Sequence, residues 1–255
     1  MPMGTYLDYL LGLPLILRVF LIALIPTLLT VVGALPVLLG LRLKESMIDI
    51  GMGFSAGVML VASFTSLLIP SLKLSSLPMA ILGFIGGVLL IRVLDTLIPH
   101  VHFIRIETIK ARRAWLIALA MIIHNIPEGM AVGAMASYNV VDGLVLALAI
   151  GIQDVPEGMA VAIPLLTIGY GASKALGIAV VSGMAELASA LIPPLLITYI
   201  NSLLPIMMAL ASGAMIYVVI HEIIPDIYGH EHNEQSTLGF FIGFLTMLIL
   251  DTILS

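Results

Sequence analysis

The chain has 255 residues, of which 61% are hydrophobic and 10% are charged, and its formal net charge at pH 7 is -5. Soluble domains carry about 25% charged residues, so this composition excludes an ordinary water-soluble protein, as does the mean hydropathy of +1.20. The negative charge indicates no nucleic-acid partner, and the absence of cysteine excludes disulfides and thiolate metal ligands. The sequence therefore predicts an integral membrane protein.

Eight apolar segments are long enough to cross a bilayer, which takes about 20 helical residues. In chain order they cover residues 19–41, 49–70, 77–98, 113–137, 141–167, 172–199, 203–227 and 237–254. Residues 5–17 precede them as a short interfacial lead-in that Pro14 interrupts. The remaining connections are short, and the longest polar one covers residues 99–112. We therefore expect an all-α membrane protein with eight transmembrane helices and one transmembrane domain, residues 1–255.

Basic residues are concentrated in alternate loops, and such loops face the cytoplasm in membrane proteins. The loops of one set carry or adjoin Arg42, Lys44, Arg105, Lys110, Arg112 and Lys174. The opposite loops contain Lys73, with Arg18 near the start of the chain. This pattern predicts a multi-pass protein of the cell membrane, in a bacterium the inner membrane, with both termini outside the cytoplasm.

An internal repeat occupies the fourth and fifth segments. HNIPEGMAVG at 124–133 is followed by QDVPEGMAVA at 153–162, and PEGMAV is identical in both copies. His124 and Glu128 are four residues apart, and Asn125 and Glu128 are three apart, so all three lie on one helical face. The second copy repeats this spacing with Gln153, Asp154 and Glu157. We expect the two faces to lie opposite each other.

The polar residues of these segments fall at one depth. His124, Gln153 and Glu186 each lie near the middle of their predicted helix, and no Lys or Arg lies near that level. Ionisable groups inside a bilayer usually mark a transport pathway. Imidazole, carboxylate and amide ligands suit Zn²⁺ or another borderline divalent ion. Two glutamates that can each bridge make a two-metal site plausible.

Two prolines fit the same site. Pro127 and Pro156 cannot donate to the carbonyls of Ile123 and Ile152, so each should kink its helix and free a carbonyl at the depth of the polar residues. Irregular backbone is tolerated at that depth where it lines a polar cavity. The sequence therefore predicts that the fourth and fifth helices are kinked around a midplane metal site.

The motif HN-x-PEG, followed one helix later by a second PEG motif, resembles the ZIP (Zrt/Irt-like) family of divalent metal transporters. The second copy begins with Gln153 and Asp154, and this variation is similar to the prokaryotic GufA-like branch. The resemblance implies a binuclear centre with Zn²⁺, Cd²⁺, Fe²⁺ or Mn²⁺ as the transported substrate and no organic cofactor. One implied site consists of Met59, His124, Glu128, Gln153 and Glu157. The other consists of Asn125, Glu128, Asp154, Glu157 and Glu186.

The resemblance also implies a route for the ion. Ser66 and Asp251, towards the outer helix ends, would form the entrance. The implied exit residues at the inner end are Asp95, His100, His102, His221 and Glu222. His230, Glu231 and His232 resemble a cytoplasmic metal-sensing loop. The family further implies import by alternating access, in which the group holding the fourth and fifth helices moves against scaffold helices, and a homodimer.

Several alternatives remain open. A membrane metalloenzyme would show a motif such as HExxH, and His221-Glu222 is followed by Ile223, Ile224 and Pro225 instead. A proton-coupled transporter of an organic anion would place Arg or Lys at the midplane. The polar residues could also form a purely structural hydrogen-bonded network. The residues themselves define an axis of transport without a direction, so efflux stays open beside uptake.

Overall fold

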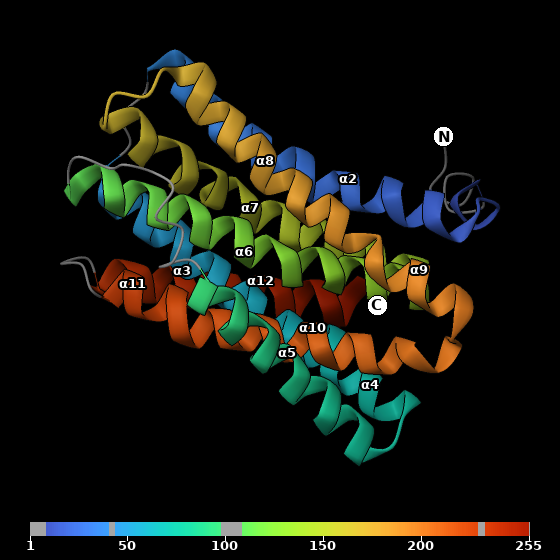
Figure 1. The fold of residues 1–255 in the computed structure, drawn as a ribbon. Coiled ribbons are helices and arrows are strands. Elements are labelled where there is room, and N and C mark those ends of the chain that lie inside the picture. Colours follow the sequence, from blue (N-terminus) through green and yellow to red (C-terminus); the bar gives the residue numbers. More distant parts are fainter. Residues whose placement is uncertain (1–8, 41–43, 98–108, 229–232, 255) are drawn as a thin grey trace.

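The computed structural model describes residues 9–40, 44–97, 109–228 and 233–254, and the regular elements in these ranges are helices (Figure 1). Eight spans in them are long and apolar enough to cross a membrane. They are Leu15–Leu39, Ser46–Leu74, Leu77–Thr96, Lys110–Tyr138, Val140–Thr167, Ala172–Tyr199, Asn201–Tyr228 and Asn233–Leu254. The predicted fold class is confirmed. The first spanning helix begins at Leu15, earlier than predicted, because Pro14 occupies its N-cap and fixes the start.

Each span is built from one or more helical elements. The third, fourth, fifth and eighth spans are the single helices α5 (Leu77–Leu97), α6 (Ile109–Tyr138), α7 (Val140–Thr167) and α12 (Asn233–Leu254). The first span consists of α2 (Leu15–Ala34) and η1 (Leu35–Leu39), and the second of α3 (Glu45–Ala62), η2 (Ser63–Leu68) and α4 (Ile69–Leu74). The sixth consists of α8 (Ala172–Ala190) and α9 (Ile192–Tyr199), and the seventh of η4 (Asn201–Leu203), α10 (Leu204–Val218), η5 (Val219–Ile223) and α11 (Ile224–Tyr228).

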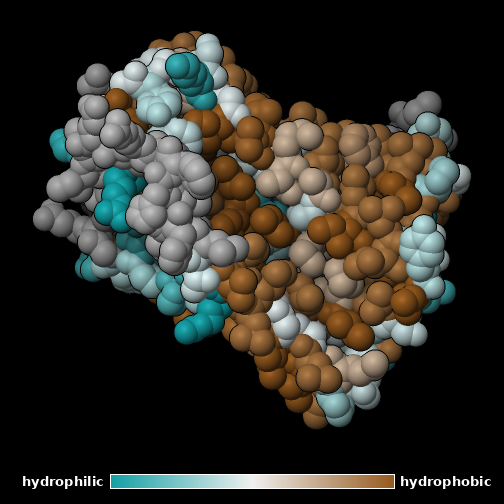
Figure 2. Space-filling view, viewed as in Figure 1, coloured by the Kyte–Doolittle hydropathy of each residue, from teal (hydrophilic) through white to brown (hydrophobic). Residues whose placement is uncertain are grey.

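The exterior of this bundle is apolar over most of its length. Figure 2 shows hydrophobic residues across the middle of the visible face and more polar residues towards its two ends. Helices α5 and α12 are the least buried spans, with 22% and 17% of their apolar windows inside the protein. A surface of this kind needs lipid or another apolar partner around it. The chain is a multi-pass membrane protein.

The helices form two groups. In the first group α2 packs along α7 and α8, and α6 packs along α7 and α8. In the second group α12 packs along α3, and α10 packs along α5. The groups meet mainly where α6 contacts α10 and where α3 contacts α7. In Figure 1 the first group lies above the second.

Glycines bring the backbones together within each group. A Cβ atom on Gly129 would lie 2.0 Å from the carbonyl oxygen of Glu186, which joins α6 to α8. A Cβ atom on Gly57 would lie 2.1 Å from the carbonyl oxygen of Phe240, which joins α3 to α12. Between the groups, Gly51 of α3 instead faces the side chain of Pro156. Small residues permit close helix packing in membranes, so each group forms a tightly packed unit.

Two neighbouring glycines of α5 test this packing. A Cβ atom on Gly87 would lie 1.9 Å from the carbonyl oxygen of Leu210, whereas one on Gly86 would meet nothing within 4 Å. We expect Gly87→Ala to lower the free energy of unfolding by about 1–3 kcal/mol, because the α10 backbone must move. Gly86→Ala should leave stability unchanged or slightly raised, since alanine favours helix over glycine. Thermal unfolding in detergent micelles checks this, and equal effects of the two changes would contradict it.

Irregular backbone occurs at places that the sequence did not predict. Helix α6 continues through Pro127, and α7 continues through Pro156 and Pro164, so the kinks expected there remain a prediction. The segments η2 and η5 are π-helical instead. Such bulges are frequent at functional sites, and these two carry three of the predicted pathway residues. They are Ser66, His221 and Glu222.

Candidate metal centre

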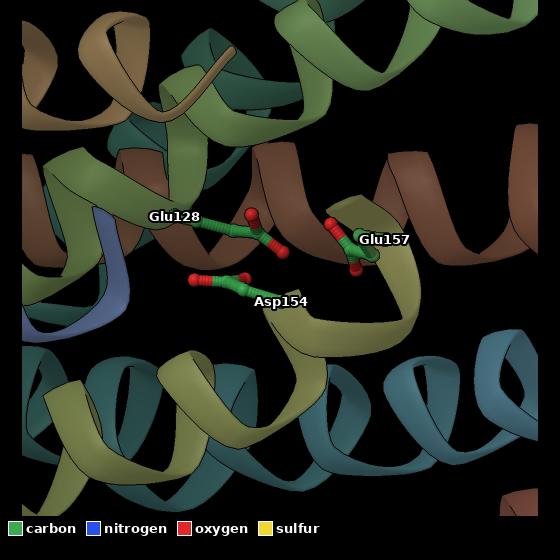
Figure 3. A group of neighbouring side chains, drawn as sticks. All are labelled: Glu128, Asp154 and Glu157. Carbon is green, nitrogen blue, oxygen red and sulfur yellow. The ribbon is translucent and has the colours of Figure 1, made fainter. Parts of the chain in front are cut away.

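Three carboxylates meet between α6 and α7. One oxygen from each of Glu128, Asp154 and Glu157 lies within 4.8 Å of the others. Figure 3 shows the three side chains close together in the space between the helices, Glu128 from α6 and the other two from α7. All three side chains are buried. The predicted facing of the two repeat copies therefore places their acidic residues together, with spacing suited to a shared cation.

An amide joins the two copies of the repeat. The Nε2 atom of Gln153 donates to Oε1 of Glu128 over 2.6 Å. The other carboxylate oxygen of Glu128 and the Oε1 atom of Gln153 have no hydrogen-bond partner among the described residues. Glu128 is thus held by one oxygen and keeps the other available. The same arrangement leaves Gln153 Oε1 free to act as a ligand.

Glu186 brings a fourth carboxylate from α8. Its side chain is fully buried, and Glu128, Asp154 and Glu157 are all close enough to act on it electrostatically. Neither of its oxygens has a hydrogen-bond partner in the described part of the chain, and the same holds for the Oδ1 atom of Asn125. Buried carboxylates without partners are strongly unfavourable unless a cation or a proton neutralises them. This donor set fits a divalent cation.

His124 makes a contact that the sequence did not predict. Its Nε2 atom lies 2.5 Å from Oε2 of Glu222, which the π-helical segment η5 carries across from the second group. Glu222 was expected at the inner exit, apart from the central site. The structure instead places its carboxylate directly against a predicted ligand. Its other oxygen, Oε1, has no hydrogen-bond partner among the described residues.

Helix α3, also of the second group, reaches the site at Glu157 of α7. Met59 is fully buried in it, as a ligand of the central site would be. One turn earlier, the hydroxyl of Ser55 donates to Oε1 of Glu157. The sequence analysis did not single out Ser55. Its position four residues before Met59, on the same helical face, is the signal that could have found it.

The two predicted entrance residues are in contact. The hydroxyl of Ser66 donates to Oδ1 of Asp251 over 3.0 Å, which joins η2 to α12. Asp142, in the first turn of α7, is close enough to Asp251 to act on it electrostatically and was not among the predicted residues. All three lie towards the end of the bundle where α12 ends and α7 begins.

Two of the predicted exit residues lie together near the end of α5. Nε2 of His221 lies 3.9 Å from Oδ2 of Asp95, so these two exit candidates are close together and partly exposed. His100, His102, His230, Glu231 and His232 lie outside the described residues. A cavity of about 430 Å³ lies between α3, α6, α7 and α11, in the half of the bundle where α6 begins and α7 ends.

This cavity begins next to the metal centre. Its lining includes Met121, three residues before His124, and Ala160, three residues after Glu157. It also includes Lys110, in the first turn of α6, and Thr167, the last residue of α7. The cavity therefore extends from one helical turn beside the carboxylates to the start of α6 and the end of α7.

Comparison with known proteins decides the family. Residues 101–251 match the family model described as ZIP Zinc transporter. The zinc transporter ZIPB of Bordetella bronchiseptica is 40% identical over 243 residues, which cover 88% of this chain and 77% of that protein. The chain belongs to the ZIP family. Two further ZIP relatives match most of their own length. They are the zinc transporter GufA of Myxococcus xanthus, 36% identical over 87% of this chain and 93% of its own, and the zinc transporter ZupT of Corynebacterium glutamicum, 33% identical over 86% and 92%.

Membership of the ZIP family agrees with the resemblance predicted from the paired PEG motifs, including the GufA-like variation of the second copy. The two motif copies lie inside the matched residues 101–251. The three carboxylates that lie together, Glu128, Asp154 and Glu157, all come from these two motif copies. Ser55 lies outside the matched range and comes from the structure alone.

Proposed function

We propose that the protein carries Zn²⁺ across the membrane through the centre formed by Glu128, Asp154, Glu157 and Glu186. The observation that carries this proposal is the group of buried carboxylates with free oxygens at one place, none of which pairs with a lysine or arginine among the described residues. A dication satisfies them, and the ligands replace its hydration shell during transit. The names of the ZIP relatives as zinc transporters support zinc as the substrate, and Cd²⁺, Fe²⁺ and Mn²⁺ are the competitors to compare.

We assign the ligands to two adjacent sites. Met59, His124 and Gln153 would complete one site with the glutamates, and Asn125, Asp154 and Glu186 would complete the other, as the family resemblance implies. Glu128 and Glu157 lie between these sets and would bridge two ions. Carboxylates and imidazole must be deprotonated to bind metal, so ion entry releases protons to the surroundings.

The cavity supports a release route towards the inner side. It reaches from one turn beside the centre to the ends of α6 and α7. The basic residues of the adjoining loops indicate that this side faces the cytoplasm. In this arrangement the ion enters past Ser66 and Asp251, is held at the carboxylates, and leaves through the cavity, which is import with both termini outside. Glu222, which contacts His124, would take the ion from the centre, and Asp95 and His221 would receive it next.

The two helix groups support alternating access. Close glycine contacts join helices within each group, while Gly51 and Pro156 meet through a side chain between the groups. An interface of side chains permits one group to slide or rock against the other more readily than backbone contacts do. The group with α6 and α7 would carry the ion. The exposed apolar faces of α5 and α12 belong to lipid or to a second copy in a homodimer.

The other functions lack a comparable observation. The relatives are named transporters, which fits the expectation that this protein is not an enzyme. A transporter of organic anions would place a basic residue at the centre, and carboxylates converge there instead. A structural network would pair its polar atoms, whereas several oxygens of Glu128, Glu157 and Glu186 stay free among the described residues.

Uptake of radioactive zinc by proteoliposomes tests this function. The purified protein should accumulate zinc well above protein-free liposomes, with saturation as the external concentration rises. Unlabelled Cd²⁺, Fe²⁺ and Mn²⁺ added as competitors give the order of metal preference. If folded protein moves none of these ions, the transport proposal is wrong and the enzyme or structural reading regains support.

A further inference from the structure

Ser55 makes an unusual use of its hydroxyl. Serine and threonine in helices commonly donate to the carbonyl four residues earlier, as Thr27, Ser63 and Ser137 do here. The hydroxyl of Ser55 instead donates across the interface between the two helix groups, to Oε1 of Glu157. Ser55 is completely buried. The backbone of α3 therefore presents a hydroxyl to a carboxylate of the metal centre.

This contact decides how Glu157 can bind an ion. With Oε1 held by Ser55, the other oxygen, Oε2, has no hydrogen-bond partner among the described residues. Glu157 is the carboxylate that faces Glu128 and Asp154 within 4.8 Å. Partners that hold one oxygen of a ligand fix its orientation and strengthen metal binding. The hydroxyl thus leaves Glu157 with one free oxygen.

We propose that Ser55 is a positioning residue for zinc recognition, which holds the carboxylate of Glu157 in the orientation that binds the ion. This inference rests on the proposed function, because it assigns Ser55 a role in binding the transported ion. Ser55 belongs to the second helix group and Glu157 to the first. Zinc affinity therefore depends on how the two groups are arranged, since the hydroxyl reaches Glu157 only while α3 and α7 are in contact here.

A purely structural role is the main alternative, and the chain offers a matched control for it. Ser71 is also completely buried in the same span, and its hydroxyl donates to another helix, over 2.7 Å to the carbonyl oxygen of Pro205. Ser71→Ala removes a buried hydrogen bond of the same kind without touching the metal centre. A structural role for Ser55 would make Ser55→Ala behave like Ser71→Ala.

The experiment measures zinc affinity by calorimetry in detergent, together with zinc uptake by proteoliposomes and thermal unfolding. We expect Ser55→Ala to weaken zinc binding about tenfold or more, the usual effect of removing a partner of a metal ligand. The KM for uptake should rise by a similar factor while the rate at saturating zinc is kept, which is the signature of lost binding. Ser55→Thr, which keeps the hydroxyl, should restore affinity, and Ser71→Ala should leave it unchanged.

Wild-type affinity in Ser55→Ala would overturn the proposal, as would equal losses of affinity and stability in Ser55→Ala and Ser71→Ala. If Ser55→Ala does not fold, Ser55→Val, which has the shape of the Ser55→Thr side chain without a donor or a metal ligand, takes its place, and affinity equal to that of Ser55→Thr overturns the proposal equally. Absence of zinc binding and uptake in the wild type would contradict the proposed function and this inference together. If the wild type binds and transports zinc but the Ser55 variants do not show the expected changes in affinity, only the role of Ser55 is contradicted.

Discussion

Glutamine in place of Glu128 or Glu157 should reduce zinc uptake by about 100-fold or more. This loss is larger than the one expected when a residue that only hydrogen-bonds to a metal ligand is removed. The substitution keeps the shape of the side chain and removes its charge. Both glutamates lie in the buried carboxylate group, where each has one oxygen without a hydrogen-bond partner among the described residues. Because each would bridge two ions, one change weakens both sites.

Initial rates of zinc uptake by proteoliposomes measure this effect, with thermal unfolding to show that each variant is folded. Glu234→Gln is the control, since Glu234 is an exposed glutamate in the first turn of α12. It should transport as the wild type does. Uptake that stays near the wild-type rate in both Glu128→Gln and Glu157→Gln would show that the ion does not pass through this centre.

Phenylalanine at position 160 should nearly abolish zinc uptake while leaving zinc binding in place. Ala160 lines the inner cavity one turn beyond Glu157 on α7. A larger side chain there fills the space through which the ion would leave, and Ala160 itself is not among the proposed ligands. Equilibrium binding therefore survives while release is blocked. Calorimetry and uptake on the same preparation separate the two effects.

A control on the same helix distinguishes blockage from general disturbance. Ile152 of α7 is 46% exposed on the outside of the bundle, so Ile152→Phe adds bulk on that helix away from the cavity. It should transport as the wild type does. Normal uptake by Ala160→Phe would contradict the release route. Loss of binding as well as uptake would indicate that the change distorts the carboxylate centre.

Much of this architecture follows directly from sequence patterns. Apolar length predicted all eight spans, because the bilayer sets that length. The spacing of Glu128 from His124, and of Glu157 from Gln153, predicted two polar helical faces, and the repeat indicated that they meet. Burial of these residues together agrees with that reasoning. Their roles as zinc ligands stay a prediction for experiment.

The missed features depend on contacts between distant helices. Glu222 was expected at the inner exit because it lies near the end of an apolar segment. The π-helical turn at Val219–Ile223 adds a residue to the local helix, which changes the face that Glu222 presents, and its carboxylate contacts His124. Ser55 was overlooked because a lone serine in an apolar helix carries little signal beyond its spacing from Met59. Only the pairing of α3 with α7 identifies its partner.

Diffraction at the zinc absorption edge, from crystals of the wild-type protein grown with zinc, tests the central claim most directly. The account predicts an anomalous peak between the carboxylates of Glu128 and Glu157, with a second peak on the side of Asp154 and Glu186 when both sites are filled. Zinc found only elsewhere, for example between Asp95 and His221, with no peak at the buried carboxylates, would contradict it.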